Sequence, residues 1–392
     1  MSGVVSSSKH TPDRIKRIAL VVPFGTQQGG AEAMLLHFLR ANAAAPRLDV
    51  VVFFLVDGPL LQTVRALGYE VEVFNAGRLR DPVRYIATLR RLRSAFRRAH
   101  VDAVLAWMTK AHLYSGLAAL GIGLPVYWFQ HGISSGGWLD RVAVAIPAIG
   151  VFACSQIAAD VQRKIAPRQQ IEVCYPAVDL ESLVRAGQDS AAVWRERLGL
   201  PQQVPVLGMV ARQERWKGVH VFIEIVRRLS VEISDLHAYV LGGAHPLDPG
   251  YAREVRALAE QSGLGSRLQL PGQCTMDENP GWLACADIVV HPTTGPEPFG
   301  MSVVEAMAMS KPVVASAHGG PCEIIRDGVD GMLCVPGNAG VFAAVIQSLL
   351  NDPSRARALG QAAQQRALEF APASLVARLS VLMHAEDLPD GA

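Results

Sequence analysis

The chain has 392 residues, of which 50% are hydrophobic and 18% are charged, and its formal net charge at pH 7 is +2. This length favours two domains over one, and the apolar content excludes a chain that is mainly disordered. The near-neutral charge argues against a nucleic-acid-binding protein.

The first half of the chain alternates apolar strands with helical stretches. Arg17–Pro23 is predicted to be the first strand, and Gly25–Gly30 the glycine-rich loop behind it. Ala31–Ala44 follows with apolar residues at helical spacing. Further strands are expected at Asp49–Leu55, Glu70–Phe74, Ala103–Trp107, Val126–Phe129, Gly150–Ala153 and Glu172–Pro176. This alternation predicts a parallel sheet with helices on both faces.

A second cycle of strands begins after a polar stretch. Its strands are expected at Val206–Val210, Ala238–Leu241, Leu268–Leu270, Ile288–His291, Pro312–Ala315 and Met332–Val335. We therefore predict an α/β protein of two Rossmann-like, doubly wound domains that face each other across a cleft, with ligands at the carboxyl ends of the strands. The predicted division is a first domain at 1–178, a linker at 179–203, a second domain at 204–370, and a C-terminal helix and tail at 371–392 that crosses back to the first domain.

The segment Glu297-Pro-Phe-Gly-Met-Ser-Val-Val-Glu305 carries the strongest functional signal. Glu297 falls on a predicted turn, and Glu305 lies within the first two turns of a helix that begins near Gly300. The free N–H groups and positive dipole end of that helix form an anion site. One carboxylate can bind hydroxyl groups on one side of the anion, and the other can bind hydroxyl groups on its other side. A sugar nucleotide has this order, because its diphosphate lies between the sugar and the ribose. The alternative interpretation is a plain turn followed by a solvated glutamate.

Two cationic residues, Arg212 and Lys217, follow the predicted strand Val206–Val210. Fixed cations in a dry cleft stabilise the charge that develops on a departing diphosphate more than they stabilise the bound donor. Arginine can contact two phosphate oxygens at once, whereas lysine acts as a point charge. The alternative is a pair of solvated loop cations.

In the first domain, candidate ligand-contacting residues follow three predicted strands. Gly29 and Gly30 would let the backbone approach a ligand closely, although the spacing is not that of a dinucleotide fingerprint. His131 follows Val126–Phe129 and would bind a sugar hydroxyl or carry a proton. Lys110 and His112 are candidates for the acceptor side. Each histidine has a structural role as its alternative.

The sequence contains no D-x-D pair, no H-E-x-x-H and no phosphate-binding P-loop motif. We therefore expect no metal site, with cationic side chains in place of a metal ion. The six cysteines form no C-x-x-C pair, and the polar N-terminus lacks the hydrophobic segment of a signal peptide. The longest apolar run, Val142 to Cys154, is shorter than the roughly 20 residues of a membrane-spanning helix. These features predict a cytoplasmic protein with free thiols.

The carboxylate segment, with Gly319-Gly-Pro-Cys-Glu-Ile-Ile and Asp327-Gly-Val-Asp-Gly331 after it, resembles the retaining family 4 glycosyltransferases of the GT-B fold. The likeness is strongest from Val206 to Pro336, and looser matches precede it in the expected order. They are Gly29-Gly-Ala-Glu32, His131-Gly132, Ser155-Gln156 and Pro176-Ala-Val-Asp179. Ala211 and Pro176-Ala177 depart from the family pattern.

The resemblance implies a role for each candidate residue. Glu297 would bind hydroxyls of the donor sugar and Glu305 the ribose, while Arg212 and Lys217 would clamp the diphosphate. Gly30 would approach the diphosphate from the other domain, and His131 would contact the sugar. Main-chain groups would hold sugar and diphosphate at Phe299, Gly300, Met301 and Ser302. The first domain would take the acceptor and the second the nucleotide sugar.

The implied activity is a retaining, metal-independent transfer of a hexose from a UDP- or GDP-sugar to a hydroxyl of a glycan or lipid-linked glycan. Assembly of surface polysaccharide or lipopolysaccharide is the implied context, and no cofactor is expected besides the donor substrate. Two alternatives stay open at this point. One is a nucleotide-sugar epimerase of the same fold, and the other is a non-catalytic nucleotide-sugar-binding protein.

The segment from Arg78 to Arg98 holds eight arginines and one acid, Asp81. Its apolar stripe is expected at Tyr85, Ile86, Leu89, Leu92 and Phe96. An amphipathic helix with a basic face can rest on anionic lipid at the inner face of a membrane. The alternative is a solvated charged face over the core of the first domain.

Overall fold

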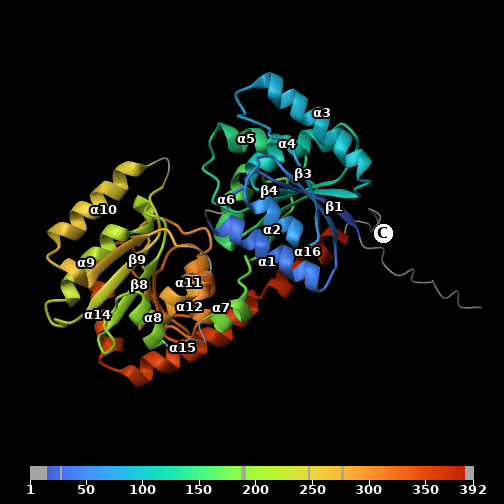
Figure 1. Cartoon of the computed structure of the whole chain (residues 1–392). Helices are drawn as coiled ribbons and strands as arrows, with labels where there is room; N and C mark the ends of the chain where they lie inside the picture. The colour runs from blue at the N-terminus through green and yellow to red at the C-terminus, as the bar shows by residue number, and fades with distance from the viewer. Residues whose placement is uncertain (1–15, 27–28, 187–190, 246–247, 275–277, 385–392) are drawn as a thin grey trace, which may run out of the picture.

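The computed structural model describes residues 16–26, 29–186, 191–245, 248–274 and 278–384. Two parallel sheets, each covered by helices on both faces, form two α/β domains that lie beside each other (Figure 1). The predicted fold class is confirmed, and the predicted strands are present with small shifts at their ends.

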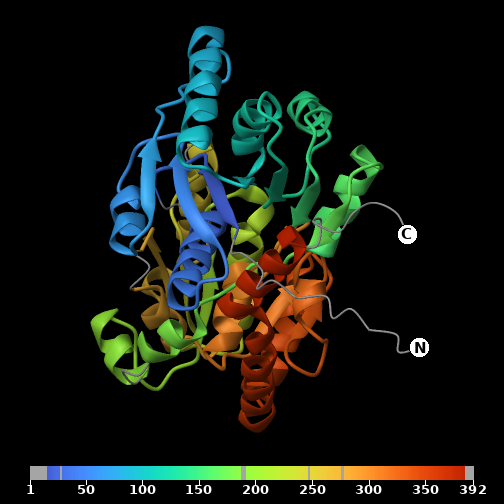
Figure 2. The same ribbon diagram turned by 90° about the vertical axis from the view of Figure 1, so that its right-hand side faces the viewer.

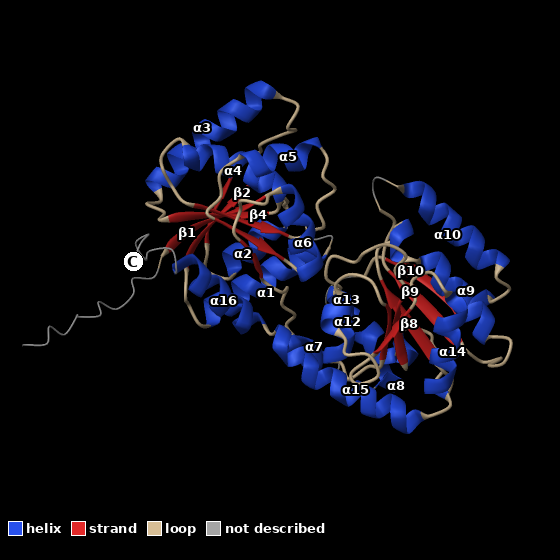
Figure 3. Ribbon diagram, turned by 180° about the vertical axis from the view of Figure 1, so that it is seen from behind, coloured by secondary structure: helices blue, strands red, loops and turns tan. Residues whose placement is uncertain are grey.

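The first sheet has the order β3-β2-β1-β4-β5-β6-β7, with all described pairs parallel. Its strands are β1 (Arg17–Val22), β2 (Asp49–Phe54), β3 (Glu70–Val73), β4 (Ala103–Trp107), β5 (Val126–Gln130), β6 (Gly150–Ala153) and β7 (Ile171–Val173). The central strands β4, β5 and β6 are wholly buried, because helices cover both faces, whereas the edge strands β3 and β7 are more exposed. These helices are α1 (Gly30–Ala44), α2 (Leu60–Ala66), α3 (Pro82–Arg98), α4 (Thr109–Leu120), α5 (Trp138–Ala145) and α6 (Gln156–Ile165) (Figure 3).

The second sheet has the order β10-β9-β8-β11-β12-β13. Its strands are β8 (Val206–Val210), β9 (His237–Leu241), β10 (Leu268–Gly272), β11 (Ile288–His291), β12 (Val313–Ser316) and β13 (Met332–Cys334). Its helices are α9 (Val219–Leu229), α10 (Pro249–Gln261), α11 (Asn279–Cys285), α12 (Met301–Ala308), α13 (Pro321–Ile324), α14 (Ala339–Leu350) and α15 (Pro353–Ala367). In both sheets the strand order reverses beside the first strand, which makes a crevice for ligands there.

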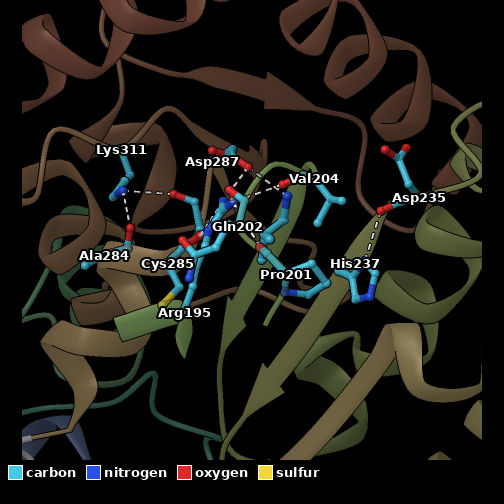
Figure 4. A network of polar contacts seen from close by, with 12 residues as sticks. Arg195, Pro201, Gln202, Val204, Asp235, His237, Ala284, Cys285, Asp287 and Lys311 are labelled. Atoms are coloured by element: carbon cyan, nitrogen blue, oxygen red, sulfur yellow. Dashed lines mark hydrogen bonds and ion pairs between the residues drawn. The ribbon is translucent and has the colours of Figure 1, made fainter. Parts of the chain in front are cut away.

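The segment expected as a linker forms two helices, α7 (Leu180–Ala186) and α8 (Ala191–Arg197), which pack against α11 and α12 of the second domain. Arg195 of α8 is buried and donates hydrogen bonds to the carbonyl oxygens of Cys285, Pro201, Gln202 and Val204 (Figure 4). It also pairs with Asp287, with Nη2 2.9 Å from Oδ2. This network attaches the segment after the first domain to the second sheet.

The last helix, α16 (Pro372–His384), lies beside α1 in the first domain, whereas α15 lies on the second (Figure 1). Leu375, Val376, Leu379 and Met383 of α16 join the hydrophobic core of the first domain. The chain therefore passes between the domains twice, at residues 174–180 and near Phe370. These two crossings are joined by a hydrogen bond from the Val178 N–H to the Phe370 carbonyl.

The basic helix differs from its prediction at two points. It begins at Pro82 and not at Arg78, because the Asp81 carboxylate caps it by accepting the Arg84 N–H and proline suits the first turn. Ile86, predicted on the buried stripe, is 49% exposed, whereas Leu92 and Phe96 are buried as expected. Figure 2 shows α3 at the outer end of the first domain. Among the described residues no helix is long and apolar enough to cross a bilayer.

Candidate active site

The candidate site lies where the second sheet reverses its order, between β8 and β11. Arg212 and Lys217 follow β8, and Glu297 follows β11, so neighbouring strands deliver the cations and the carboxylate to one edge. The Gly320 N–H donates to the Glu297 carbonyl oxygen at 2.8 Å. A Cβ at Gly319 would lie 2.3 Å from that same oxygen, so only glycine allows this approach.

Glu297 is buried and its Oε2 accepts two hydrogen bonds. Lys217 Nζ lies 2.6 Å from this oxygen and His291 Nε2 lies 3.1 Å from it. Burial opposes ionisation of Glu297, but the charge of Lys217 and the bond from His291 outweigh it and lower the pKa to about 2. Glu297 is therefore a carboxylate at neutral pH. It is suited to accept hydrogen bonds from hydroxyls and unsuited to act as a general acid.

Glu305 has a different environment, one helix turn into α12. Its Oε2 accepts a hydrogen bond from Asn279 Nδ2 at 3.1 Å. Burial raises its pKa, and the bond from Asn279 offsets only part of that effect. Between the two glutamates, Gly300 (φ 110°) precedes the first turn of α12, which contains Met301 and Ser302. Phe299 is buried against Tyr175 and Phe370 at the crossing between domains.

The glycine loop of the first domain meets the second domain at this place. A Cβ at Gly30 would lie 3.1 Å from Met301 Cγ, and one at Gly29 would lie 3.9 Å from Arg212 Cζ. Arg212 Nη2 is 2.9 Å from Glu214 Oε1, an ion-pair contact within its own domain. Thus Gly29, Gly30, Arg212 and Met301 are brought together across the domain boundary. Residues 27–28 of the predicted loop lie outside the described residues.

His131 lies against the rings of Trp107 and Phe129, with ring centroids 4.4 Å away in each case. Its Nε2 is buried and has no hydrogen-bond partner among the described residues. Burial lowers its pKa to about 3, so the imidazole is neutral at physiological pH. A neutral ring can hydrogen-bond a hydroxyl, but the low pKa disfavours the proton-carrying role considered from the sequence.

The two acceptor-side candidates differ. His112 is fully buried in α4, stacked on Trp128 at 4.8 Å, with Nε2 3.2 Å from the Ala143 carbonyl oxygen. The expectation that His112 contacts the acceptor is wrong, because its ring is part of the core of the first domain. Lys110, two residues earlier, is half-buried, and desolvation lowers its pKa. It follows Met108, whose φ of 78° places a non-glycine residue in the left-handed region at the end of β4.

The comparisons with known proteins agree with this architecture. Residues 190–366 match the family model described as Glycosyl transferases group 1, and residues 28–182 match Glycosyltransferase Family 4. A D-inositol 3-phosphate glycosyltransferase of Catenulispora acidiphila is 29% identical, over 94% of this chain and 94% of its own length. Anabaena HepE, solved in complex with UDP and glucose, is 25% identical with a TM-score of 0.81, over 94% of this chain and 99% of that one.

The chain is a glycosyltransferase of the GT-B fold. A D-inositol 3-phosphate glycosyltransferase of Salinispora arenicola is 33% identical, but the match spans 54% of this chain and 48% of that protein. Within the described residues of the transferase, no group of three or more His, Cys, Asp or Glu side chains could hold a metal ion.

Three polar residues of the transferase's site were missed from the sequence. His291 ends the predicted strand Ile288–His291, and its position six residues before Glu297 was a usable signal. Asn279 contacts Glu305 from α11 with no local motif to mark it. Glu323 of α13 accepts the backbone N–H groups of Gln156 and Ile157 at the start of α6, at 2.7 and 3.1 Å. It thereby holds the two domains together beside the Glu297 loop.

Proposed function

We propose that the protein is a retaining glycosyltransferase that moves a hexose from a UDP- or GDP-sugar to a hydroxyl of a glycan or lipid-linked glycan. The observation that carries this proposal is the buried Glu297–Lys217 pair beside the N-terminus of α12, with Glu305 one helix turn beyond. An ionised acceptor of hydrogen bonds, an anion-binding helix end and a second carboxylate thus follow one another along a single segment.

In the proposed donor complex, Glu297 accepts hydrogen bonds from hydroxyls of the transferring sugar, and Glu305 binds the ribose. The diphosphate lies at the start of α12, held by main-chain groups of residues 299–302 and by Arg212 and Lys217. Lys217 has three N–H donors, so it can bind a phosphate oxygen while it keeps its bond to Glu297. Gly29 and Gly30 close the site from the first domain, because their lack of side chains allows the close approach to Arg212 and Met301.

The chemistry that we propose is displacement on one face of the sugar. The bond between the anomeric carbon and the diphosphate oxygen breaks while a bond to the acceptor hydroxyl oxygen forms on the same face. The departing phosphate oxygen takes the acceptor's proton, so no protein base is required. Lys217 and Arg212 stabilise the charge on the leaving group, which supports a mechanism that does not depend on a metal ion. Isolation of a covalent glycosyl-enzyme would contradict this mechanism.

Of the two donor nucleotides, UDP is favoured, since the HepE structure that resembles this chain holds UDP. A thermal-shift screen over UDP- and GDP-sugars tests the donor, because a ligand that binds the folded state raises the melting temperature. The best donor is then incubated with EDTA, with and without glycan and polyol phosphate acceptors. Transfer of the sugar to an acceptor supports the proposal. An isomeric nucleotide sugar formed from donor alone would instead indicate an epimerase, and donor binding without any turnover a binding protein.

We further propose that the acceptor is lipid-linked and that the first domain contacts an anionic membrane through α3 and α5. These helices flank α4 in one layer (Figure 3), and both expose apolar side chains. The exposed fractions are 77% for Val83 and 49% for Ile86 on α3, and 67% for Trp138 and 45% for Val142 on α5. Exposed arginines accompany them at Arg84, Arg90, Arg97 and Arg141. A membrane interface accommodates this mixture of apolar and basic residues.

The protein should sediment with anionic vesicles at low salt and be released at high salt. A Trp138→Ser, Val142→Ser double variant should bind these vesicles at least about 10-fold more weakly, because two apolar side chains no longer insert. Val231→Ser in the second domain is the matched control, since Val231 is 78% exposed. Equal sedimentation with neutral vesicles, or an unaffected double variant, would contradict the membrane proposal.

A further inference from the structure

We propose that His291 is a positioning residue that fixes the Glu297 carboxylate so that one of its oxygens remains available for the donor sugar. The inference rests on the proposed function, because it assigns Glu297 to a sugar hydroxyl. It goes beyond that function by adding a residue that touches neither sugar nor phosphate and acts through Glu297.

The two oxygens of the Glu297 carboxylate have different partners. His291 Nε2 and Lys217 Nζ both donate to Oε2, at 3.1 and 2.6 Å. Within the described part of the chain, Oε1 takes part in no hydrogen bond. Two donors that approach one oxygen from different elements, the end of β11 and the turn after β8, restrict rotation of the carboxylate. They leave Oε1 as the acceptor for a substrate hydroxyl.

The imidazole of His291 also reaches the start of α12. Its Nδ1 lies 3.5 Å from Ser302 Oγ, a long contact in which the hydroxyl donates and Nδ1 accepts. The neutral tautomer with its proton on Nε2 satisfies both ring nitrogens at once, toward Glu297 and toward Ser302. The ring therefore contacts both the Glu297 carboxylate and the first turn of α12.

A purely structural role would not explain the choice of residue. His291 is 2% exposed and follows Ile288, Val289 and Val290, so an apolar side chain would suit the position without the cost of burying a polar ring. Both ring nitrogens have partners, and both partners belong to the proposed donor site. His112, a buried histidine of the first domain, instead has Nδ1 without a partner among the described residues.

The test compares His291→Leu, which removes the donor to Glu297, with His291→Gln, whose amide can donate from the same place. We expect the leucine variant to lose about 10- to 100-fold in kcat for transfer from UDP-glucose, as for one hydrogen bond to a charged group. Its affinity for UDP should stay within about 2-fold of the wild type, because His291 contacts neither ribose nor diphosphate in the proposal. The glutamine variant should recover most of the lost kcat. His237→Leu, on β9 of the same domain, is the control and should leave both quantities unchanged.

A wild-type kcat in the leucine variant would overturn the proposal. So would a parallel loss of UDP affinity and melting temperature that glutamine fails to rescue, since that pattern indicates a structural role. The difference in affinity between UDP-glucose and UDP is measured for each variant as well, and it needs no turnover. If the wild type binds UDP-glucose but transfers no sugar, the proposed function fails. In that case the positioning role is supported if the leucine variant binds UDP-glucose no more tightly than UDP. It is refuted if the leucine variant keeps the wild-type difference in affinity between the two ligands.

Discussion

Replacing Glu297 by glutamine should lower kcat for sugar transfer by at least about 100-fold, the range found when one preorganised hydrogen-bonding group at a reacting centre is removed. Glu297 is ionised, because Lys217 and His291 lower its pKa to about 2. Glutamine has the same shape as glutamate, but its amide has only one oxygen that accepts hydrogen bonds where the carboxylate has two. The partly buried ammonium group of Lys217 then loses the negative charge that it pairs with. Glu297→Ala should abolish transfer altogether.

The measurement is kcat for each variant, corrected for the folded fraction from a melting curve, because loss of a buried ion-pair partner also destabilises the fold. Glu260→Gln, an exposed glutamate at the end of α10, is the matched control and should retain wild-type kcat. Full activity of Glu297→Gln or Glu297→Ala would show that Glu297 does not act on the transferring sugar.

The second large effect is on stability, at Arg195. Arg195→Ala should destabilise the second domain by about 1–3 kcal/mol, the usual cost when a buried hydrogen-bonding group loses its partner. The side chain is 7% exposed and serves four carbonyl oxygens besides Asp287 (Figure 4). Asp287 also accepts the Val206 N–H at 2.8 Å, so the network joins α8 to the starts of β8 and β11. Without Arg195 the carbonyl oxygen of Cys285 stays buried and loses its two donors.

A melting curve detects this change as a fall of several degrees, at roughly 2–4 °C for each kcal/mol in a domain of this size. Arg185→Ala on α7 is the control, because its pairing with Glu181 is exposed and contributes little. A melting temperature equal to that of the wild type would contradict the account of α8 as part of the second domain.

Local sequence patterns were enough to predict the fold. Buried parallel strands such as Val206–Val210 are apolar throughout, and helices separate them, so the two-sheet architecture follows from short-range information. The position of Glu297 after β11 followed from the same pattern. Contacts between distant residues were not accessible in this way. Asn279 meets Glu305, and Glu323 meets α6, only through the tertiary fold, and no spacing in the sequence marks either pair.

The sequence also did not determine how deeply individual polar side chains are buried. His112 and His131 both follow predicted apolar strands, yet one is a core residue and the other has a buried nitrogen without a described partner. The helix after Asp81 also began later than its charge pattern indicated, because local capping overrides the run of arginines.

The division of roles between the two glutamates is the central claim, and calorimetric binding of UDP and UDP-glucose to three proteins tests it most directly. Glu297→Gln should bind UDP as the wild type does and lose the affinity that glucose adds. Glu305→Ala should bind UDP and UDP-glucose more weakly by the same factor, about 10- to 100-fold for a lost hydrogen bond to a charged group. If Glu305→Ala bound UDP like the wild type, or if Glu297→Gln lost UDP itself, the assignment of sugar to Glu297 and ribose to Glu305 would be contradicted.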